Sequence, residues 1–334
     1  MKRNNSIKEI FDKIKSSKRI LISLHKGPDG DSLGSCMALK YLLERDFNKK
    51  VKIISKDSLS SELKIFDFVK EIEFGKSMDS FSAEKFDILI APDFGTIEGF
   101  SEKGKSNFFT ISIDHHDTHT YFGNLNYVNS GRPSCCSVLL DIFKELKIHF
   151  DKELSTRLLL GIYTDSGMFA HDNGDALRDA VFLIDRGADY LDGIVNPLKY
   201  NISLTSRKYL ALVTDKFRIV NFNGFKIGVS VVSKEDIRDL NLELADIRGA
   251  PNYLQEIGGV DFLFTLAERE EGIKGSFRSR KKIDVLRFAK ELGGGGHKFA
   301  ASFILEKMPM DKAEKKVFEA IKKVGVVKID NINL

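Results

Sequence analysis

The fold is indicated most clearly by nine consecutive residues, Phe108-Phe109-Thr110-Ile111-Ser112-Ile113-Asp114-His115-His116. The first six form a short, mainly apolar run, which is typical of a β-strand buried on both faces. The last three are a carboxylate and two imidazoles, which are costly to bury without partners and well suited to binding a divalent metal ion. The stretch therefore predicts a buried strand with a metal site at its carboxyl end.

Apolar strands alternate with helices through the first half of the chain. Strands are expected at residues 19–24, 51–54, 87–91 and 108–113, and helices at residues 7–14, 32–45, 134–146, 153–163 and 175–186. Continuously apolar strands separated by helices indicate an α/β fold with a parallel sheet covered by helices on both faces. Ligands of such sheets bind at the carboxyl ends of the strands, near the point where the strand order reverses.

The second half of the chain has a different pattern. Asn223-Gly224 joins two apolar runs and is a strong signal for a β-hairpin. Strands are expected at residues 217–221, 225–232, 260–267, 272–277 and 299–305, with a helix at 283–292. This pattern indicates a smaller mixed α/β domain. We therefore expect a first domain at residues 1–186, a linker at 187–206 and a second domain at 207–334.

Length and composition agree with two folded domains. The chain has 334 residues, of which 42% are apolar and 30% charged, and domains usually contain about 100–200 residues. Its apolar runs reach about six residues, whereas a membrane span needs roughly 20. The first residues contain no apolar core of a secretory signal, and three cysteines cannot form a disulfide framework. We therefore expect a cytoplasmic protein that does not bind membranes. The net charge of +4 is too small to imply duplex nucleic acid binding.

Three further acidic clusters lie at predicted ends of strands or at the end of a helix. His25, Asp29 and Asp31 lie on a turn between a strand and a helix, Asp93 follows the strand at 87–91, and Asp165 ends a helix. Mixed histidine and carboxylate ligands suit manganese, zinc, iron or magnesium. The four clusters together point to a metal-dependent hydrolase.

Each cluster also has an explanation without a metal. Asp31 or Ser32 could cap the helix that follows, and Asp93 could be a turn residue. Asp165 could simply precede a helix stop at Gly167, although the helix dipole disfavours a carboxylate at that end. A single cap does not account for His25 and its neighbouring carboxylates together.

The carboxyl-terminal half contains a compact basic segment. Residues 276–298 include seven basic residues, lysines and arginines together, but only two acidic ones. Four glycines at 293–296 precede His297 and would expose backbone amides to a phosphate. The alternative is a flexible loop beside a solvated basic helix face.

In order and spacing, these motifs resemble those of the DHH phosphoesterase family. The resemblance rests on the cluster at residues 25–35, on Asp93, on Asp114-His115-His116 and on residues 164–167, with residues 293–302 similar to the glycine-rich signature of the DHH-associated domain. It covers about residues 18–305 and is closest to bacterial stand-alone enzymes that act on nanoRNA, pAp or cyclic di-AMP. Ser302 and Ser166 depart from the family pattern, where glycine and threonine are usual.

The resemblance implies a role for each site residue. It implies two divalent metal ions, manganese in the first place with magnesium or cobalt as alternatives. His25, Asp29 and Asp93 would hold one ion, and Asp31, Asp93, His115 and Asp165 the other, with Asp93 bridging. Asp114 and His116 would be catalytic, His116 contacting phosphate or assisting the leaving group and Asp114 orienting a metal ligand. Substrate would be bound by Arg278, Ser279, Gly294, Gly295, Gly296 and His297.

The function implied is hydrolysis of a short nucleotide by water activated between two metals. Cyclic di-AMP, linear dinucleotides such as pApA, short oligoribonucleotides and pAp are the candidate substrates. The alternatives are a single-strand-specific 5′ exonuclease and a nucleotide sensor without hydrolytic activity. The lack of an added nucleic-acid-binding module counts against the exonuclease. The expected partner is a small nucleotide or short oligonucleotide, and a homodimer is left open.

Overall fold

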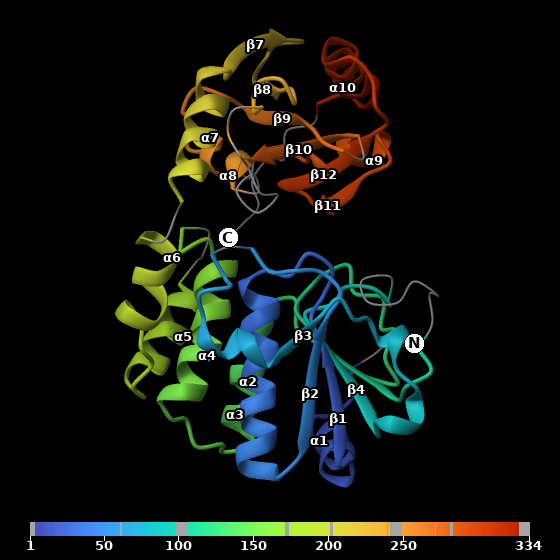
Figure 1. The fold of residues 1–334 in the computed structure, drawn as a ribbon, viewed down its shortest axis with the longest axis vertical. Helices are drawn as coiled ribbons and strands as arrows, with labels where there is room; N and C mark the ends of the chain where they lie inside the picture. The colour runs from blue at the N-terminus through green and yellow to red at the C-terminus, as the bar shows by residue number, and fades with distance from the viewer. Residues whose placement is uncertain are drawn as a thin grey trace. The chain divides into compact units, whose positions relative to one another are not determined.

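The chain forms two compact units. The computed structural model describes residues 4–60, 62–97, 106–170, 174–200, 203–238, 240, 249–270, 272–280 and 283–326. The units comprise Met1–Asn201 and Ile202–Leu334 and are shown in Figure 1. Their boundary falls inside the segment 187–206 that was predicted to be a linker. Much of this segment is helical, in a π-helical turn at Leu191–Val195, in α6 (Asn196–Tyr200) and at the start of α7 (Leu204–Asp215).

The first unit contains a six-stranded sheet whose neighbouring strands are all parallel. The strand order is β3-β2-β1-β4-β5-β6. The strands are β1 (Arg19–Ser23), β2 (Lys50–Ser55), β3 (Ile72–Phe74), β4 (Ile88–Pro92), β5 (Thr110–Asp114) and β6 (Leu125–Val128). The chain order reverses between β1 and β4, so the ligand crevice of such a sheet is expected beyond the carboxyl ends of these two strands.

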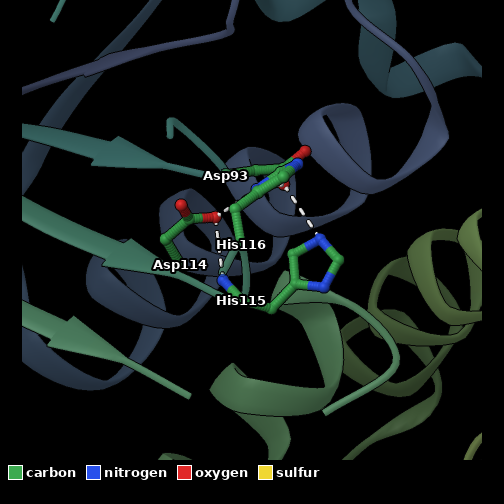
Figure 2. A group of neighbouring side chains, drawn as sticks. All are labelled: Asp93, Asp114, His115 and His116. Carbon is green, nitrogen blue, oxygen red and sulfur yellow. Dashed lines mark hydrogen bonds and ion pairs between the residues drawn. The ribbon is translucent and has the colours of Figure 1, made fainter. Parts of the chain in front are cut away.

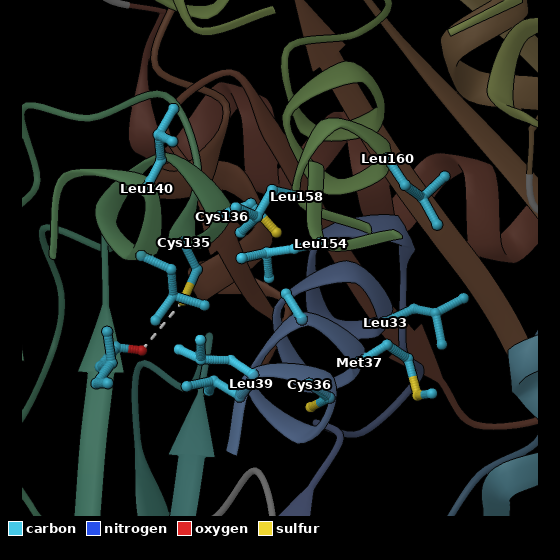
Figure 3. Close-up of a cluster of buried hydrophobic side chains, with 14 of the residues drawn as sticks. Leu33, Cys36, Met37, Leu39, Cys135, Cys136, Leu140, Leu154, Leu158 and Leu160 are labelled. Carbon is cyan, nitrogen blue, oxygen red and sulfur yellow. Dashed lines mark hydrogen bonds between the residues drawn. The ribbon is translucent and has the colours of Figure 1, made fainter. Parts of the chain in front are cut away.

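The α-helices of this unit share one apolar core with one face of the sheet. Besides α6, they are α1 (Ile7–Ser16), α2 (Gly30–Phe47), α3 (Cys135–Glu145), α4 (Lys152–Asp165) and α5 (Asp175–Ile184). Figure 3 shows α2, α3 and α4 meeting in this core, with the buried, free cysteines Cys36, Cys135 and Cys136 among its leucines. The cysteines are therefore core residues.

The opposite face of the sheet is covered by shorter elements. Leu21, Ile54 and Leu89 belong to a second core with Met78, which lies in a 3-10 helix at Met78–Ser80. Phe81 and Phe86 pack against that core, the latter directly after a 3-10 helix at Ala83–Lys85. The predicted α/β class with a covered parallel sheet is confirmed, with the longer helices on one face.

The second unit contains a mixed sheet, as predicted. Its order is β11-β12-β10-β9-β8-β7, and the β8–β9 pair alone is parallel among the paired strands described. The strands are β7 (Arg218–Phe222), β8 (Phe225–Val232), β9 (Phe262–Glu268), β10 (Ile273–Ser279), β11 (Gly295–His297) and β12 (Ala300–Leu305). Asn223 and Gly224 have φ values of 50° and 81°, which confirms the predicted hairpin turn.

The two faces of this second sheet carry different cores. Phe264, Phe277 and Phe303 pack with residues of α9 (Leu286–Glu291) and α10 (Met310–Val324) on one face. On the other face, Val232 and Leu263 pack with residues of α7 and of α8 (Ala250–Leu254). Among the described residues of the whole chain, no helix combines the length and apolarity that crossing a bilayer would need.

Candidate metal centre

The loop after β1 brings His25 and Asp29 together at the amino end of α2. Asp29 caps this helix, because its Oδ1 accepts hydrogen bonds from the amides of Asp31 (3.1 Å) and Ser32 (3.0 Å). The cap is therefore Asp29, and neither Asp31 nor Ser32 takes that role. Nδ1 of His25 lies 3.0 Å from the carbonyl of Lys26, which fixes the ring and turns Nε2 toward Asp29 Oδ1 (3.5 Å).

Asp31 is held by the amino terminus of α3. Its carboxylate is 1% exposed and accepts hydrogen bonds from the amides of Cys135 (2.6 Å) and Cys136 (3.0 Å). Helix α4 approaches closely here, since a Cβ atom at Gly161 would lie 2.6 Å from Asp31 Oδ1. The positive end of the α3 dipole stabilises this buried charge, and the absence of a side chain at Gly161 leaves room for it.

Asp93 follows β4 in a left-handed backbone conformation, with φ 62°. Its amide donates to the carbonyl of Ile113 (2.9 Å), and the residue is 4% exposed. Oδ2 lies 3.4 Å from His25 Nε2. Oδ1 is buried and has no hydrogen-bond partner among the described residues. A buried carboxylate oxygen without a partner is costly, so its place in the centre fits metal ligation.

The two histidines after β5 take different orientations, as Figure 2 shows. Asp114 is fully buried, and its Oδ1 accepts from the amide of His115 (2.8 Å) and lies 2.8 Å from His116 Nδ1. His115 turns its Nε2 to Asp93 Oδ1 (3.6 Å) and to Asp165 Oδ2 (3.5 Å). His116 is thus anchored on Asp114, while His115 faces the carboxylates of other elements.

These side chains form three groups of potential ligands. Within each group the ligand atoms all lie within 4.8 Å of one another. The groups are His25, Asp29 and Asp93; Asp31, His115 and Asp165; and Asp93, Asp114, His115 and His116. The first two groups together contain all six residues that were predicted as metal ligands.

The charges of the site favour a bound cation. Burial raises the pKa of Asp31 well above its ordinary value, and the negative charge of Asp93 raises it further. Desolvation likewise raises the pKa of Asp165 well above its ordinary value, as does the charge of Asp31. Carboxylates crowded in this way cannot all ionise easily without a compensating charge. Divalent cations would supply that charge, so the donor set fits a metal centre.

The imidazoles respond to the same carboxylates. Burial by itself lowers the pKa of His25, but Asp29 and Asp93 outweigh burial and raise this pKa well above its ordinary value. For His116, burial again opposes protonation, and the hydrogen bond and charge of Asp114 raise the pKa to about 9. A bound cation opposes protonation of both rings, so metal binding is expected to release protons.

A network behind His115 was not predicted from the sequence. Nδ1 of His115 lies 3.4 Å from the carbonyl of Arg132. The Arg132 guanidinium is held by Asp179 of α5 (2.6 Å) and by Asp141 of α3 (2.9 Å), and the Ser137 hydroxyl also donates to Asp179 (2.7 Å). This network connects two helices to the ring orientation of His115. The charge of Arg132 is thus used within the protein.

The predicted substrate-binding residues lie in the second unit. Arg278 Nε donates to Asn252 Oδ1 (2.6 Å), and Arg278 Nη1 donates to the carbonyl of Phe277 (2.8 Å). Ser279 is 2% exposed, and its hydroxyl accepts from the amide of Ile283 (3.0 Å), which favours a structural role.

The predicted glycines lie at β11, next to β12. A Cβ atom at Gly294 would lie 2.1 Å from the carbonyl oxygen of Ser302, and Gly296 has φ 129°. Gly295 and Gly296 pair with Ser302 and Ala301, and His297 pairs with Ala300. Gly294 and Gly296 are therefore required by the backbone, and β11 extends the sheet beyond β12, which separates it from β10, the strand of Arg278.

The chain matches two family models and several known proteins. The model of the DHH family, N-terminal domain, matches residues 19–162, and that of the DHHA1 domain matches residues 224–324. A "Bifunctional oligoribonuclease and PAP phosphatase NrnA" of Thermus thermophilus is 29% identical over 91% of this chain and 89% of its own length. A protein of the same name from Mycoplasma genitalium is 27% identical over 91% of this chain and 93% of its own length.

Among solved structures, an exopolyphosphatase-related protein of Bacteroides fragilis shares the fold. Its TM-score is 0.86 at 23% identity, over 95% of each chain. The two family models follow one another along the chain and together span most of it, and the first contains five of the six candidate metal ligands. The chain therefore belongs to the DHH family, with a DHH amino-terminal domain followed by a DHHA1 domain.

Proposed function

We propose that this protein is a phosphodiesterase that hydrolyses short nucleotides with the help of two divalent metal ions. The proposal rests above all on two ligand groups that lie next to each other. Oδ1 of Asp93 in the first group is 3.6 Å from Nε2 of His115 in the second. The names of the NrnA relatives support a substrate of a few nucleotides or a nucleoside bisphosphate.

Six side chains would hold the ions, namely the three of each of the first two groups. Asp93 belongs to the first group, and because its Oδ1 lies 3.6 Å from His115 of the second, it would serve both ions. When bound, such ions lower the pKa of a water molecule and neutralise charge that develops on the phosphoryl oxygens. Manganese suits this mixture of carboxylates and imidazoles, and magnesium or cobalt are the alternatives.

The protein's own groups supply positioning and proton transfer. Asp114 would keep His116 oriented by accepting a hydrogen bond from its Nδ1. Nε2 of His116 is then the nitrogen that would contact the phosphate or donate a proton to the leaving oxygen. The carbonyl of Arg132 holds His115 with Nε2 toward the carboxylates, as ligand-orienting groups commonly do. Arg278 would bind a terminal phosphate through its guanidinium.

The test compares initial rates on cyclic di-AMP, pApA, pAp and a five-residue RNA in the presence of manganese. We expect turnover of at least one of these, and loss of at least about a hundredfold in a His115→Ala variant, which removes a ligand. His149→Ala is the matched control, because His149 is an exposed histidine of the same unit. Its rates should equal those of the wild type.

The alternatives make different predictions in the same assay. A 5′ exonuclease would degrade long single-stranded DNA faster than any of the four short substrates. A sensor would bind a nucleotide and leave all four intact. Either result would contradict the proposal.

A further inference from the structure

Asp179 is a buried aspartate on α5, a helix that supplies none of the potential ligands found among the described residues. It is 4% exposed, and its Oδ2 accepts hydrogen bonds from Nη2 of Arg132 (2.6 Å) and from the hydroxyl of Ser137 (2.7 Å). Arg132 precedes α3, and Ser137 lies in the first turn of that helix. One carboxylate oxygen therefore ties the amino terminus of α3 to α5, through a residue before the start of α3 and a residue after it.

The segment tied in this way positions two potential metal ligands. The first two amides of α3 donate to the carboxylate of Asp31 (2.6 and 3.0 Å). The carbonyl of Arg132 lies 3.4 Å from Nδ1 of His115. Residues 132–137 thus orient two of the three members of the second ligand group, which consists of Asp31, His115 and Asp165.

The first ligand group, His25, Asp29 and Asp93, is held by other elements. Asp29 caps α2, and Nδ1 of His25 lies beside the carbonyl of Lys26. Asp93 follows β4, and its amide donates to the carbonyl of Ile113 in β5. The contacts of Asp179 therefore lead mainly to the second group.

We propose that Asp179 is a positioning residue that raises the affinity of the second group for its metal ion and leaves the first group nearly unaffected. The inference rests on the proposed function for the presence of the ions. Groups that orient a metal ligand typically change metal affinity by about 10- to 100-fold.

Asp141 cannot take over this role. It also accepts from Nη2 of Arg132 (3.3 Å), but it belongs to α3 itself. The pair of Arg132 with Asp141 therefore joins α3 to its own amino-terminal loop, whereas the pair with Asp179 fixes that loop against a second helix. Removing the charge of Asp179 should loosen the amides that hold Asp31 together with the carbonyl that holds His115.

The experiment measures manganese binding to the full chain by calorimetry in two backgrounds. Asp29→Asn weakens the first group and keeps a residue that can cap α2, whereas Asp165→Asn weakens the second group. In the Asp29→Asn background, adding Asp179→Asn should weaken manganese binding by at least about tenfold. In the Asp165→Asn background, the same substitution should change it by less than about twofold, as for independent sites.

Asp151→Asn is the matched control in both backgrounds. Like Asp179, Asp151 accepts from an arginine, Arg45 (2.7 Å), and from a hydroxyl, that of Tyr41 (2.7 Å). It caps α4 at the amino end, about 20 Å along the helix from Asp165. The control should lower the free energy of unfolding as Asp179→Asn does, and leave manganese binding unchanged.

Ser137→Ala is a milder second test, because it removes one donor to Asp179 and little volume. It should weaken manganese binding in the Asp29→Asn background alone, and it decides the matter if Asp179→Asn does not fold. Equal weakening in both backgrounds, or none in either, would overturn the inference. An equally large effect of Asp151→Asn would do so as well, since the role of Asp179 would then be general stability. Failure of the Asp29→Asn variant to bind manganese would also contradict it, because the second group would hold no ion of its own.

This binding assay and the rate assay can fail separately. A loss of manganese confined to the second group, without turnover of any substrate by the wild type, would leave the role of Asp179 standing and contradict the proposed function. Turnover by the wild type, with equal losses at both groups, would do the reverse.

Discussion

Asp93 is the residue on which the candidate centre depends most. It belongs to two of the three ligand groups, and one of its buried oxygens has no hydrogen-bond partner among the residues described. Its left-handed backbone conformation is one that aspartate and asparagine tolerate better than most residues. A left-handed backbone and a buried carboxylate oxygen without a hydrogen bond, found together in one residue, indicate a residue kept for a ligand rather than for stability.

The substitution Asp93→Asn tests this interpretation. Asparagine accepts the same backbone conformation but removes the charge that repels Asp31. We expect turnover to fall by at least about a hundredfold, while the melting temperature of the metal-free protein stays equal or rises. A clear fall in the metal-free melting temperature would show that the carboxylate is structural.

At the scale of elements, the site depends on how closely α2, α3 and α4 approach. Gly161 of α4 is the point of contact, since an added Cβ would lie 2.3 Å from Cys136 Sγ and 2.6 Å from Asp31 Oδ1. Both neighbours are buried, and close packing leaves them little freedom to move. The position of Asp31 is therefore set by a glycine far from it in the sequence.

Gly161→Ala should accordingly displace Asp31 from the amides of α3. We expect a loss of about 1–3 kcal/mol in the free energy of unfolding from overpacking, together with weaker manganese binding. Gly258→Ala is the matched control, because no atom lies within 4 Å of a Cβ built at that position. If Gly161→Ala and the control bind manganese equally well, the packing argument fails.

The amino ends of β1 and β4 are joined by Asp87. Its carboxylate accepts from the amides of Lys18 (2.7 Å) and Arg19 (2.8 Å), and these bonds lower its pKa to about 2. A lowered pKa in the folded state means that this stabilisation is present above the unfolded value near 3.9 and is lost as the pH falls toward 2.

Asp87→Asn should therefore lower the free energy of unfolding by about 1 kcal/mol at pH 7. Denaturant unfolding at several pH values should show the difference from the wild type shrinking between about pH 4 and pH 2. A difference that stays constant over this range would exclude the carboxylate as its source.

The elements also show what the sequence could predict. The strands β1, β4 and β5 are continuous apolar runs and were found within about two residues. β3 and β6 have three and four residues and are too short for a periodic pattern to emerge. α10 was not predicted, although Ala313, Val317 and Ile321 repeat every four residues along its buried side, so its signal was present in the sequence.

For the whole molecule, the sequence indicated which side chains form the centre because parallel strands end at one edge of a sheet. His25, Asp93 and His115 follow three strands, and the topology alone brings them together. The support of Arg132 by Asp179 could not be predicted, because the two residues are 47 positions apart and meet only through the packing of their segments. Ser279 was predicted to bind substrate from the family resemblance, but it lies on the opposite face of β10 from Arg278, and its burial follows from strand alternation.

The central claim is that the first unit holds two divalent ions that hydrolysis requires. The most direct measurement is a calorimetric titration of the metal-free protein with manganese, followed in parallel by the rate on pApA and pAp. The account predicts two ions bound per chain, with turnover of at least one substrate appearing as they bind. Binding of a single ion, or undiminished turnover in the presence of a chelator, would contradict it.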